Sequence, residues 1–284
     1  MTTDTAPTSP DIETTETSTA GGATNAEGTK RLSVRSIWRQ PLPLRAYSPV
    51  DRVLIRSFVT YLHWRGLEVS GVEHVSEVND PFVFVANHSQ KPEAVLVPTV
   101  MVFFRRGRNI HFLADWPWLL MPIVSSLYRR SEVIRVMGKS PKLKFLNVFK
   151  PLFHVDSPAM DRAHERLQAG ASVGIFPEGT VNRDPNHLLR GQSGAAMLAM
   201  RAGVPVVPAG IRFPDHRGDG PIGDFERMTI HVGAPLTPPT PADAERLKRS
   251  EIRAFHGKIM EALARLSGKQ WHPEAKRRRP HHGG

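Results

Sequence analysis

The sequence predicts an α/β fold: a single domain with a largely parallel central sheet covered by helices, preceded by an amphipathic helix and flanked by disordered tails. Three observations predict it. Short apolar runs typical of strands alternate with helical patterns between residues 82 and 266, an order that favours a covered parallel sheet. The 284 residues, 40% of them hydrophobic, suffice for one sizeable core. Residues 1–30 are of low complexity, which is typical of a disordered tail.

Each element follows from a local pattern. The run 82–86 is short and apolar, and it predicts the first strand of the core. Further strands are expected at 109–113, 133–136, 172–176, 204–207 and 228–232. Helices are expected at 92–104, 159–169, 194–202 and 241–266. Pro92 suits the first turn of a helix, and Gly170 suits the residue just past the end of one.

These patterns divide the chain into four segments. We expect a disordered tail at 1–30, a basic amphipathic segment that associates with membranes at 31–68, the main domain at 69–268 and a basic tail at 269–284. Within the second segment, apolar residues fall on helical spacing that is interrupted by Arg52, Arg56 and Arg65. They are Val50, Val53, Leu54, Phe58, Tyr61, Leu62 and Trp64. Such a helix either lies in the head-group layer of a membrane or packs on the domain. The apolar run 116–121 poses the same question.

Charge and composition exclude several classes of protein. The chain carries 38 Lys and Arg against 27 Asp and Glu, a net charge of +11. A basic body suits polyanionic partners: nucleic acid, an anionic membrane surface or phosphorylated small molecules. Because no zinc spacing or nucleic-acid-binding motif accompanies the charge, no nucleic acid partner is expected. The absence of cysteine excludes disulfides, zinc–thiolate sites and a cysteine nucleophile.

The hydrophobic runs are too short to cross a bilayer. The uncharged apolar run 116–128 has 13 residues, whereas a spanning helix needs about 18 or more. The first residues also lack the basic and apolar regions of a secretory signal. We therefore expect a cytoplasmic protein that is peripheral on the inner face of the cell membrane.

Two short motifs carry the chemistry, each at the end of an expected strand. Residues 87–93 (Asn-His-Ser-Gln-Lys-Pro-Glu) lie between a strand and a helix, where α/β sheets bind ligands. There Glu93 can fold back on His88, fix its tautomer and leave the other ring nitrogen as a base. Taken alone, this spacing is also consistent with a purely structural pair. Residues 176–180 (Phe-Pro-Glu-Gly-Thr) offer a carboxylate, a hydroxyl and free backbone N–H groups, although Pro and Gly alone would explain a turn.

These two motifs, in this order, make the chain resemble the glycerophospholipid acyltransferases, the family of lysophosphatidic acid acyltransferase. A block with Arg135 and the run 204–208 (Val-Pro-Val-Val-Pro) match two further family blocks, so the resemblance runs from about residue 69 to 211. The sequence departs from the family in two places. Glu93 replaces an aspartate, and Val181 replaces an arginine. Arg183 and Arg190 are the candidates to supply the lost charge.

The resemblance implies an acyl transfer without a metal, a cofactor or a covalent acyl-enzyme. His88 would be the general base and Glu93 would orient it. Acyl-CoA or an acyl carrier protein would donate the acyl group to a lysophospholipid such as 1-acylglycerol-3-phosphate. The acceptor head group would be held by Arg135, Glu178, Gly179, Thr180, Arg183 and Arg190. The segment 69–268 is then the acyltransferase domain.

Two alternatives remain at this point. Residues 191–195 (Gly-Gln-Ser-Gly-Ala) nearly match the turn that carries the nucleophile of serine hydrolases, with Ser193 as the nucleophile. The two departures also allow a catalytically inactive family member that only binds membranes.

Overall fold

A seven-stranded sheet forms the centre of the computed structural model, which describes residues 33–42, 47–115, 132–136, 158–239 and 247–274. The strands are β1 (Glu68–Ser70), β2 (Val83–Ala86), β3 (Ile110–Asp115), β4 (Ile134–Val136), β5 (Ser172–Ile175), β6 (Val206–Arg212) and β7 (Thr229–Val232). Their order in the sheet is β1-β7-β6-β2-β5-β3-β4. All neighbours are parallel except β6 and β7, which are antiparallel. This confirms the predicted α/β fold with a largely parallel sheet.

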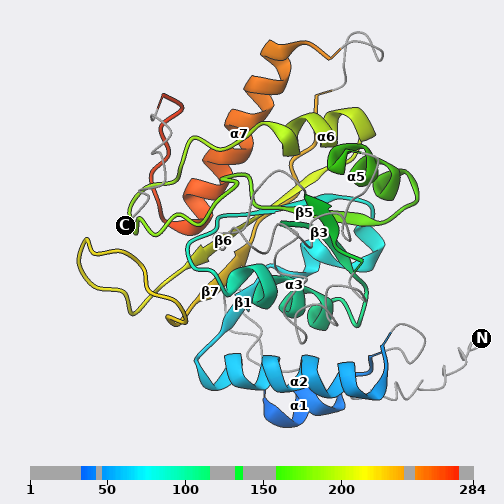
Figure 1. Ribbon diagram of the computed structural model, residues 1–284, viewed down its shortest axis with the longest axis vertical. Helices are drawn as coiled ribbons and strands as arrows, with labels where there is room; N and C mark the ends of the chain where they lie inside the picture. Colours follow the sequence, from blue (N-terminus) through cyan, green and yellow to red (C-terminus); the bar gives the residue numbers. More distant parts are fainter. Residues whose placement is uncertain (1–32, 43–46, 116–131, 137–157, 240–246, 275–284) are drawn as a thin grey trace, which may run out of the picture.

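Helices cover both faces of the sheet (Figure 1). They are α1 (Val34–Arg39), α2 (Pro49–Trp64), α3 (Glu93–Phe104), α5 (Ala159–Gln168), α6 (Gly194–Ala202) and α7 (Arg249–Ser267), with two 3₁₀ turns at Val72–Val75 and Glu77–Asn79. Alternate residues of β2 point to opposite faces, as strand geometry requires. Phe84 packs in the cluster with α3, whereas Val83 packs in the cluster with α5, α6 and α7. Helices α1 and α2 lie beyond α3 and share a third apolar cluster with it.

The helix expected within 31–68 forms as α2, and its start has a clear local cause. Ser48 and Asp51 make reciprocal side-chain bonds to each other's backbone N–H groups, and Pro49 occupies the first helical position. Several other predictions concern residues that the structure does not describe. Residues 1–30, 116–121 and most of the basic tail fall outside the described residues. Of the helix expected at 241–266, residues 241–246 also fall outside, and α7 begins at Arg249.

The expected tail at 269–284 begins inside the packed domain. Lys269 is 5% exposed, and the next residue, Gln270, pairs with the loop that follows β5. Its carbonyl accepts from Leu188 N at 2.8 Å, and its N–H donates to Asn186 O at 2.7 Å. The helix α7 therefore continues into a segment that the fold holds in place. In the described part of the chain, no helix is both long and apolar enough to pass through a bilayer.

One buried ion pair ties α3 to the start of the central strands. Arg105, directly after α3, donates from Nη2 to both carboxylate oxygens of Asp80, each at 2.8 Å. Asp80 also accepts from Ser172 Oγ at the start of β5. Burial lowers the pKa of Arg105, and the bonds to Asp80 oppose that shift. Both side chains are almost fully buried, so removal of either partner would leave the other as a buried charge without its counterion.

We expect Asp80→Ala to lower the free energy of unfolding by about 3–5 kcal/mol, because it leaves the Arg105 guanidinium buried without its counterion. The matched control is Asp161→Ala, which breaks a pair with Arg201 of similar length, 2.7 Å, between two half-exposed side chains. That loss should stay below about 1 kcal/mol. Urea unfolding followed by circular dichroism measures both values, and equal losses would contradict this interpretation.

Candidate active site

The two predicted motifs meet at the carboxyl ends of β2 and β5. These strands are parallel neighbours with Val85 opposite Ile175, so the loops that follow them leave the sheet side by side. The first loop runs from Asn87 to the start of α3, and the second contains residues 176–180. Ligands of open parallel sheets bind at this edge.

His88 and Glu93 form a buried hydrogen-bonded pair. His88 Nδ1 lies 2.9 Å from Glu93 Oε2. The same oxygen accepts from Ser89 N at 2.7 Å. Because an ionised carboxylate only accepts, Nδ1 carries the proton and Nε2 is the basic nitrogen of the ring. Glu93 is fully buried at the first position of α3, and among the described residues its Oε1 has no hydrogen-bond partner.

Contacts from β6 and from the loop after β5 hold the His88 loop. The ring of His88 stacks on Phe176, after β5, with centroids 4.5 Å apart and an interplanar angle of 25°. Asn87 bonds to β6 through its side chain, accepting from Ile211 N at 2.7 Å and donating to Ile211 O at 3.1 Å. The carbonyl of His88 accepts from Asn182 N at 2.7 Å. The imidazole therefore has a fixed position at the edge of the sheet.

Glu178 lies behind this loop instead of facing solvent. It is 5% exposed, and its Oε1 accepts from His88 N at 3.0 Å. Its Oε2 accepts from Asn182 Nδ2 at 2.8 Å and from Leu189 N at 2.9 Å. Burial raises the pKa of the Glu178 carboxyl, while these hydrogen bonds and the charge of Lys269 oppose the rise. Glu178, which the sequence analysis expects to hold the acceptor head group, therefore makes three hydrogen bonds within the protein.

The other expected head-group residues are spread more widely. Gly179 has a φ of +68°, which favours glycine, and Thr180 is exposed. Arg183 pairs with Asp224 at 2.6 Å. Asp224 also accepts from the N–H of Lys91, at 3.0 Å, so Arg183 connects to the His88 loop through one carboxylate. Burial raises the pKa of Asp224, but these bonds outweigh it, and the net shift is downward.

The other two arginines expected at the head group, Arg190 and Arg135, lie further from the His88–Glu93 pair. Arg190 is exposed, and within the described residues no hydrogen bond joins its guanidinium to the His88 loop; its carbonyl accepts from His256 and Trp271, each at 3.2 Å. Arg135 lies on β4, the edge strand, which is separated from β2 by β5 and β3. The side chain of Arg135 is outside the described part of the structure.

Lys269 is the functional candidate that the sequence did not indicate. Its Nζ donates to Ser89 Oγ at 2.8 Å and to the carbonyl of Asp184 at 2.7 Å. Ser89 lies 180 residues earlier in the chain, and no spacing rule links the two. Only the three-dimensional structure brings this ammonium group into contact with the first motif, residues 87–93.

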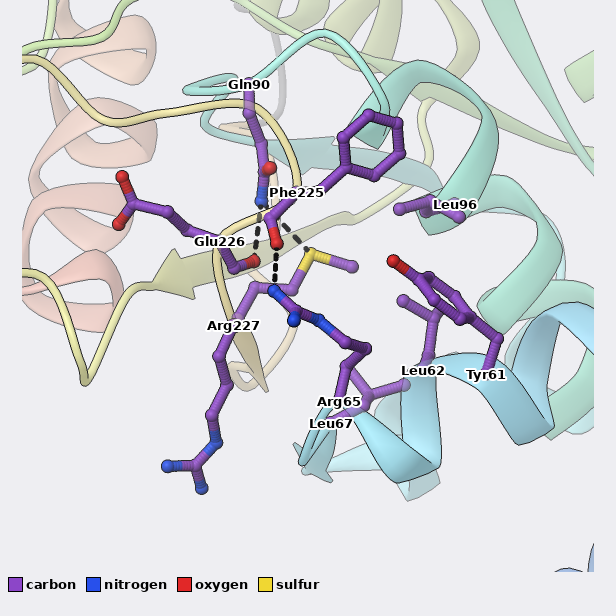
Figure 2. A pocket seen from close by; sticks show the side chains of 10 residues that line it. Tyr61, Leu62, Arg65, Leu67, Gln90, Leu96, Phe225, Glu226 and Arg227 are labelled. Atoms are coloured by element: carbon purple, nitrogen blue, oxygen red, sulfur yellow. Dashed lines mark hydrogen bonds between the residues drawn. The ribbon is translucent and has the colours of Figure 1, made fainter.

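A narrow pocket opens between α2, α3 and the loop before β7 (Figure 2). Its walls are largely apolar, with Arg65 and Arg227 among the residues at its edge. The lining residues are Tyr61, Leu62, Arg65, Leu67, Gln90, Leu96, Phe225, Glu226, Arg227 and Met228. Gln90, two positions after His88, donates to Glu226 O at 3.3 Å. The pocket therefore connects the amphipathic helix α2 with the His88 loop.

The serine-hydrolase alternative does not fit the geometry. A nucleophile turn of that class joins a strand directly to a helix. Ser193 precedes α6, but β5 ends at Ile175 and a long loop separates the two. The side chain of Ser193 is exposed.

Among the described residues, no group of three or more His, Asp or Glu side chains is placed to hold a metal ion.

Known proteins share the part of the chain that forms this site. The acyltransferase family model matches residues 66–212. Chloroplastic 1-acyl-sn-glycerol-3-phosphate acyltransferases of Brassica napus and Arabidopsis thaliana are each 28% identical, over 141 and 142 residues. Each match covers 50% of this chain and about a third of the relative, 36% and 35%. Among solved structures, the 1-acyl-sn-glycerophosphate acyltransferase PlsC of Thermotoga maritima is similar at 17% identity, with a TM-score of 0.46 and coverage of 80% of this chain and 87% of that one. Because the family match spans just over half of the chain and contains both motifs, the protein belongs to the glycerophospholipid acyltransferase family.

Proposed function

We propose that this protein transfers a fatty acyl group from acyl-CoA or an acylated carrier protein to the free hydroxyl of a lysophospholipid such as 1-acylglycerol-3-phosphate. The observation that carries the proposal is the His88–Glu93 pair, fixed at the carboxyl edge of the sheet with Nδ1 bonded to the carboxylate.

The chemistry follows from the protonation state of the ring. His88 Nε2 accepts the proton of the acceptor hydroxyl as that oxygen attacks the thioester carbonyl carbon. The resulting tetrahedral intermediate collapses, the C–S bond breaks, and the imidazolium returns the proton to the leaving thiolate. The products are a new ester and a free thiol. Glu93 keeps the ring oriented and stabilises the imidazolium while it exists.

Glu178 is proposed as a positioning residue for His88. Its Oε1 fixes the backbone N–H of His88, and its Oε2 ties the loop 182–189 to the same point. Contact with the acceptor phosphate is then proposed for the groups nearer the surface: the exposed hydroxyl of Thr180, the backbone at Gly179 and the guanidinium of Arg183. An arginine suits this task because it can bind two phosphate oxygens at once. Arg135 and Arg190 are proposed only as contributors to the surrounding positive charge.

We also propose that α1 and α2 hold the protein on an anionic membrane surface, on the inner face of the cell membrane. One side of α2 packs on the domain through Ile55 and Val59, while Trp64 is 75% exposed and Val50 is 66% exposed. The two sequence interpretations of this helix are therefore compatible: it packs on the domain and also presents apolar side chains to solvent. The basic body adds electrostatic attraction to anionic lipids.

We expect His88→Ala to lower acyl transfer by at least about 10²–10⁴-fold, because the general base is lost. Glu93→Gln should also lower it, whereas Glu93→Asp should keep part of the activity because the carboxylate remains. Purified protein is incubated with labelled acyl-CoA and a panel of lysolipids. His74→Ala, outside the site, is the control, and thermal unfolding verifies that the variants fold. Full activity in His88→Ala together with loss in Ser193→Ala would restore the hydrolase alternative.

For Glu178 we expect the alanine variant to lose roughly 3 kcal/mol of unfolding free energy, because three buried donors lose their acceptor. Thr180→Ala, two residues away and exposed, should change stability by less than about 0.5 kcal/mol. Chemical denaturation compares the two. If Glu178→Ala were as stable as Thr180→Ala, the positioning role would be wrong and direct contact with the head group would be favoured.

The membrane proposal predicts that the double variant Val50→Ser, Trp64→Ser binds vesicles on the order of tenfold more weakly, because two apolar side chains no longer enter the head-group layer. Vesicles of phosphatidylglycerol and phosphatidylethanolamine are sedimented with the protein at low and high salt. The control is Met197→Ser on α6, an exposed apolar residue on the other side of the sheet in Figure 1. Equal binding by both variants would argue against this surface.

A further inference from the structure

Lys269 is a buried cationic residue that contacts the His88 loop and has no part in the proposed acyl transfer itself. It follows α7 by two residues, and Gly268, with a φ of +73°, turns the chain back towards the sheet. The backbone bonds of Gln270 to residues 186–188 then hold the segment in place. The lysine is thus presented to the site by the fold and lies beyond residue 212, where the family match ends.

The ammonium group contacts the loop that carries the base. Lys269 Nζ donates to Ser89 Oγ, and Ser89 N donates to Glu93 Oε2. One residue therefore connects the lysine to the carboxylate that orients His88. The second bond, to the carbonyl of Asp184, anchors the ammonium to the loop after β5. Lys269 therefore links the loop after β2 to the loop after β5.

Lys269 is buried and has acidic residues around it. Burial lowers its pKa, and the negative charges of Glu178, Glu93 and Asp184 oppose that shift. Glu93 and Glu178 are themselves buried, and Glu93 Oε1 has no hydrogen-bond partner among the described residues. A buried carboxylate with one unpartnered oxygen stays ionised more readily beside a positive charge. Several charged and titratable groups lie around the His88–Glu93 pair. They are Glu178, Asp184 and His187 from the loop after β5, Lys91 from the His88 loop, Asp224 from the loop before β7, and Lys269 from the segment after α7.

We propose that Lys269 is a positioning residue for the His88–Glu93 pair: it fixes the Ser89 turn and places a positive charge near the carboxylate that orients the imidazole. The inference rests on the proposed function, since it assigns the lysine a part in activating the same base. It differs from a merely structural role, in which Lys269 would only fasten the C-terminal segment to the domain.

The two roles differ in their effect on pH dependence. Removing a buried positive charge favours uptake of a proton by the groups around it, so the pair would take up its first proton at a higher pH, whichever partner receives it. In Lys269→Met, we expect the midpoint of the acidic limb of kcat/KM to rise by about one pH unit. The rate relative to wild type then falls on the order of tenfold more at pH 6 than at pH 9. A structural role would lower the rate equally at every pH.

Two controls isolate the charge. Lys269→Arg keeps a cation, and Lys258→Met removes an exposed one from α7; both should leave the midpoint within a few tenths of a pH unit of wild type. An unchanged midpoint in a folded Lys269→Met would overturn the proposal. So would an equal shift in Lys258→Met.

A second readout does not depend on activity. The ring resonances of His88, assigned by their loss in His88→Ala, are titrated by NMR in full-length wild type and Lys269→Met, and the midpoint should rise in the variant. If wild type transfers no acyl group to any acceptor, the proposed function fails, while this titration still decides the role of Lys269. If thermal unfolding shows that Lys269→Met does not fold, Lys269→Gln replaces it. If neither folds, the ¹³Cε resonance of Lys269 in wild type decides: a lysine already neutral at pH 7 would overturn the proposal.

Discussion

The site depends on one bond, between the carboxylate of Glu93 and the Nδ1–H of His88. For this bond to form, β2 must end at Ala86 and α3 must begin at Glu93, so that a six-residue loop returns the carboxylate beneath the imidazole. The start of α3 suits the charge, because a helix N-terminus carries positive potential and free N–H groups. Ser89 N, in the loop before the helix, donates to the same oxygen. Burial makes the arrangement rigid, and it also makes the charge of Glu93 costly unless other groups compensate for it.

Compensation comes from parts of the chain that are far apart in sequence. Glu178 brings a second buried carboxylate to the back of the loop, where it accepts from two backbone N–H groups and one amide. Two buried negative charges in one region would repel each other and favour protonation of one of them. Lys269 lies against the same loop with a positive charge. The sheet, the loop after β5 and the segment after α7 thus each contribute groups that contact the loop of one imidazole.

The parts of this arrangement that sequence could predict are the local ones. The apolar run of β2, the strand before residues 176–180 and the five-residue spacing from His88 to Glu93 are all visible within a short window, and the structure contains them. The inward direction of Glu178 was not visible, because its donors come from residues 88, 182 and 189 and no pattern links them. Lys269 was assigned to a tail because a basic run follows it, although Gly268 and Gln270 return it to the domain. Long-range contacts of this kind leave no period in a sequence.

The pocket in Figure 2 lies between the two features on which the proposed function rests: the His88 loop, proposed for acyl transfer, and α2, proposed for membrane binding. Tyr61 and Leu62 of α2 and Leu96 of α3 form its apolar side, while Gln90 joins it to the loop of His88, the proposed general base. A substrate with a hydrocarbon chain and a phosphate head group needs an apolar surface and a cationic one within reach of the same base. Here the helix whose other residues, Val50 and Trp64, are exposed also contributes the wall of the pocket. Contact of α2 with a bilayer would therefore place the pocket, which Gln90 of the His88 loop also lines, on the side of the protein that faces the membrane.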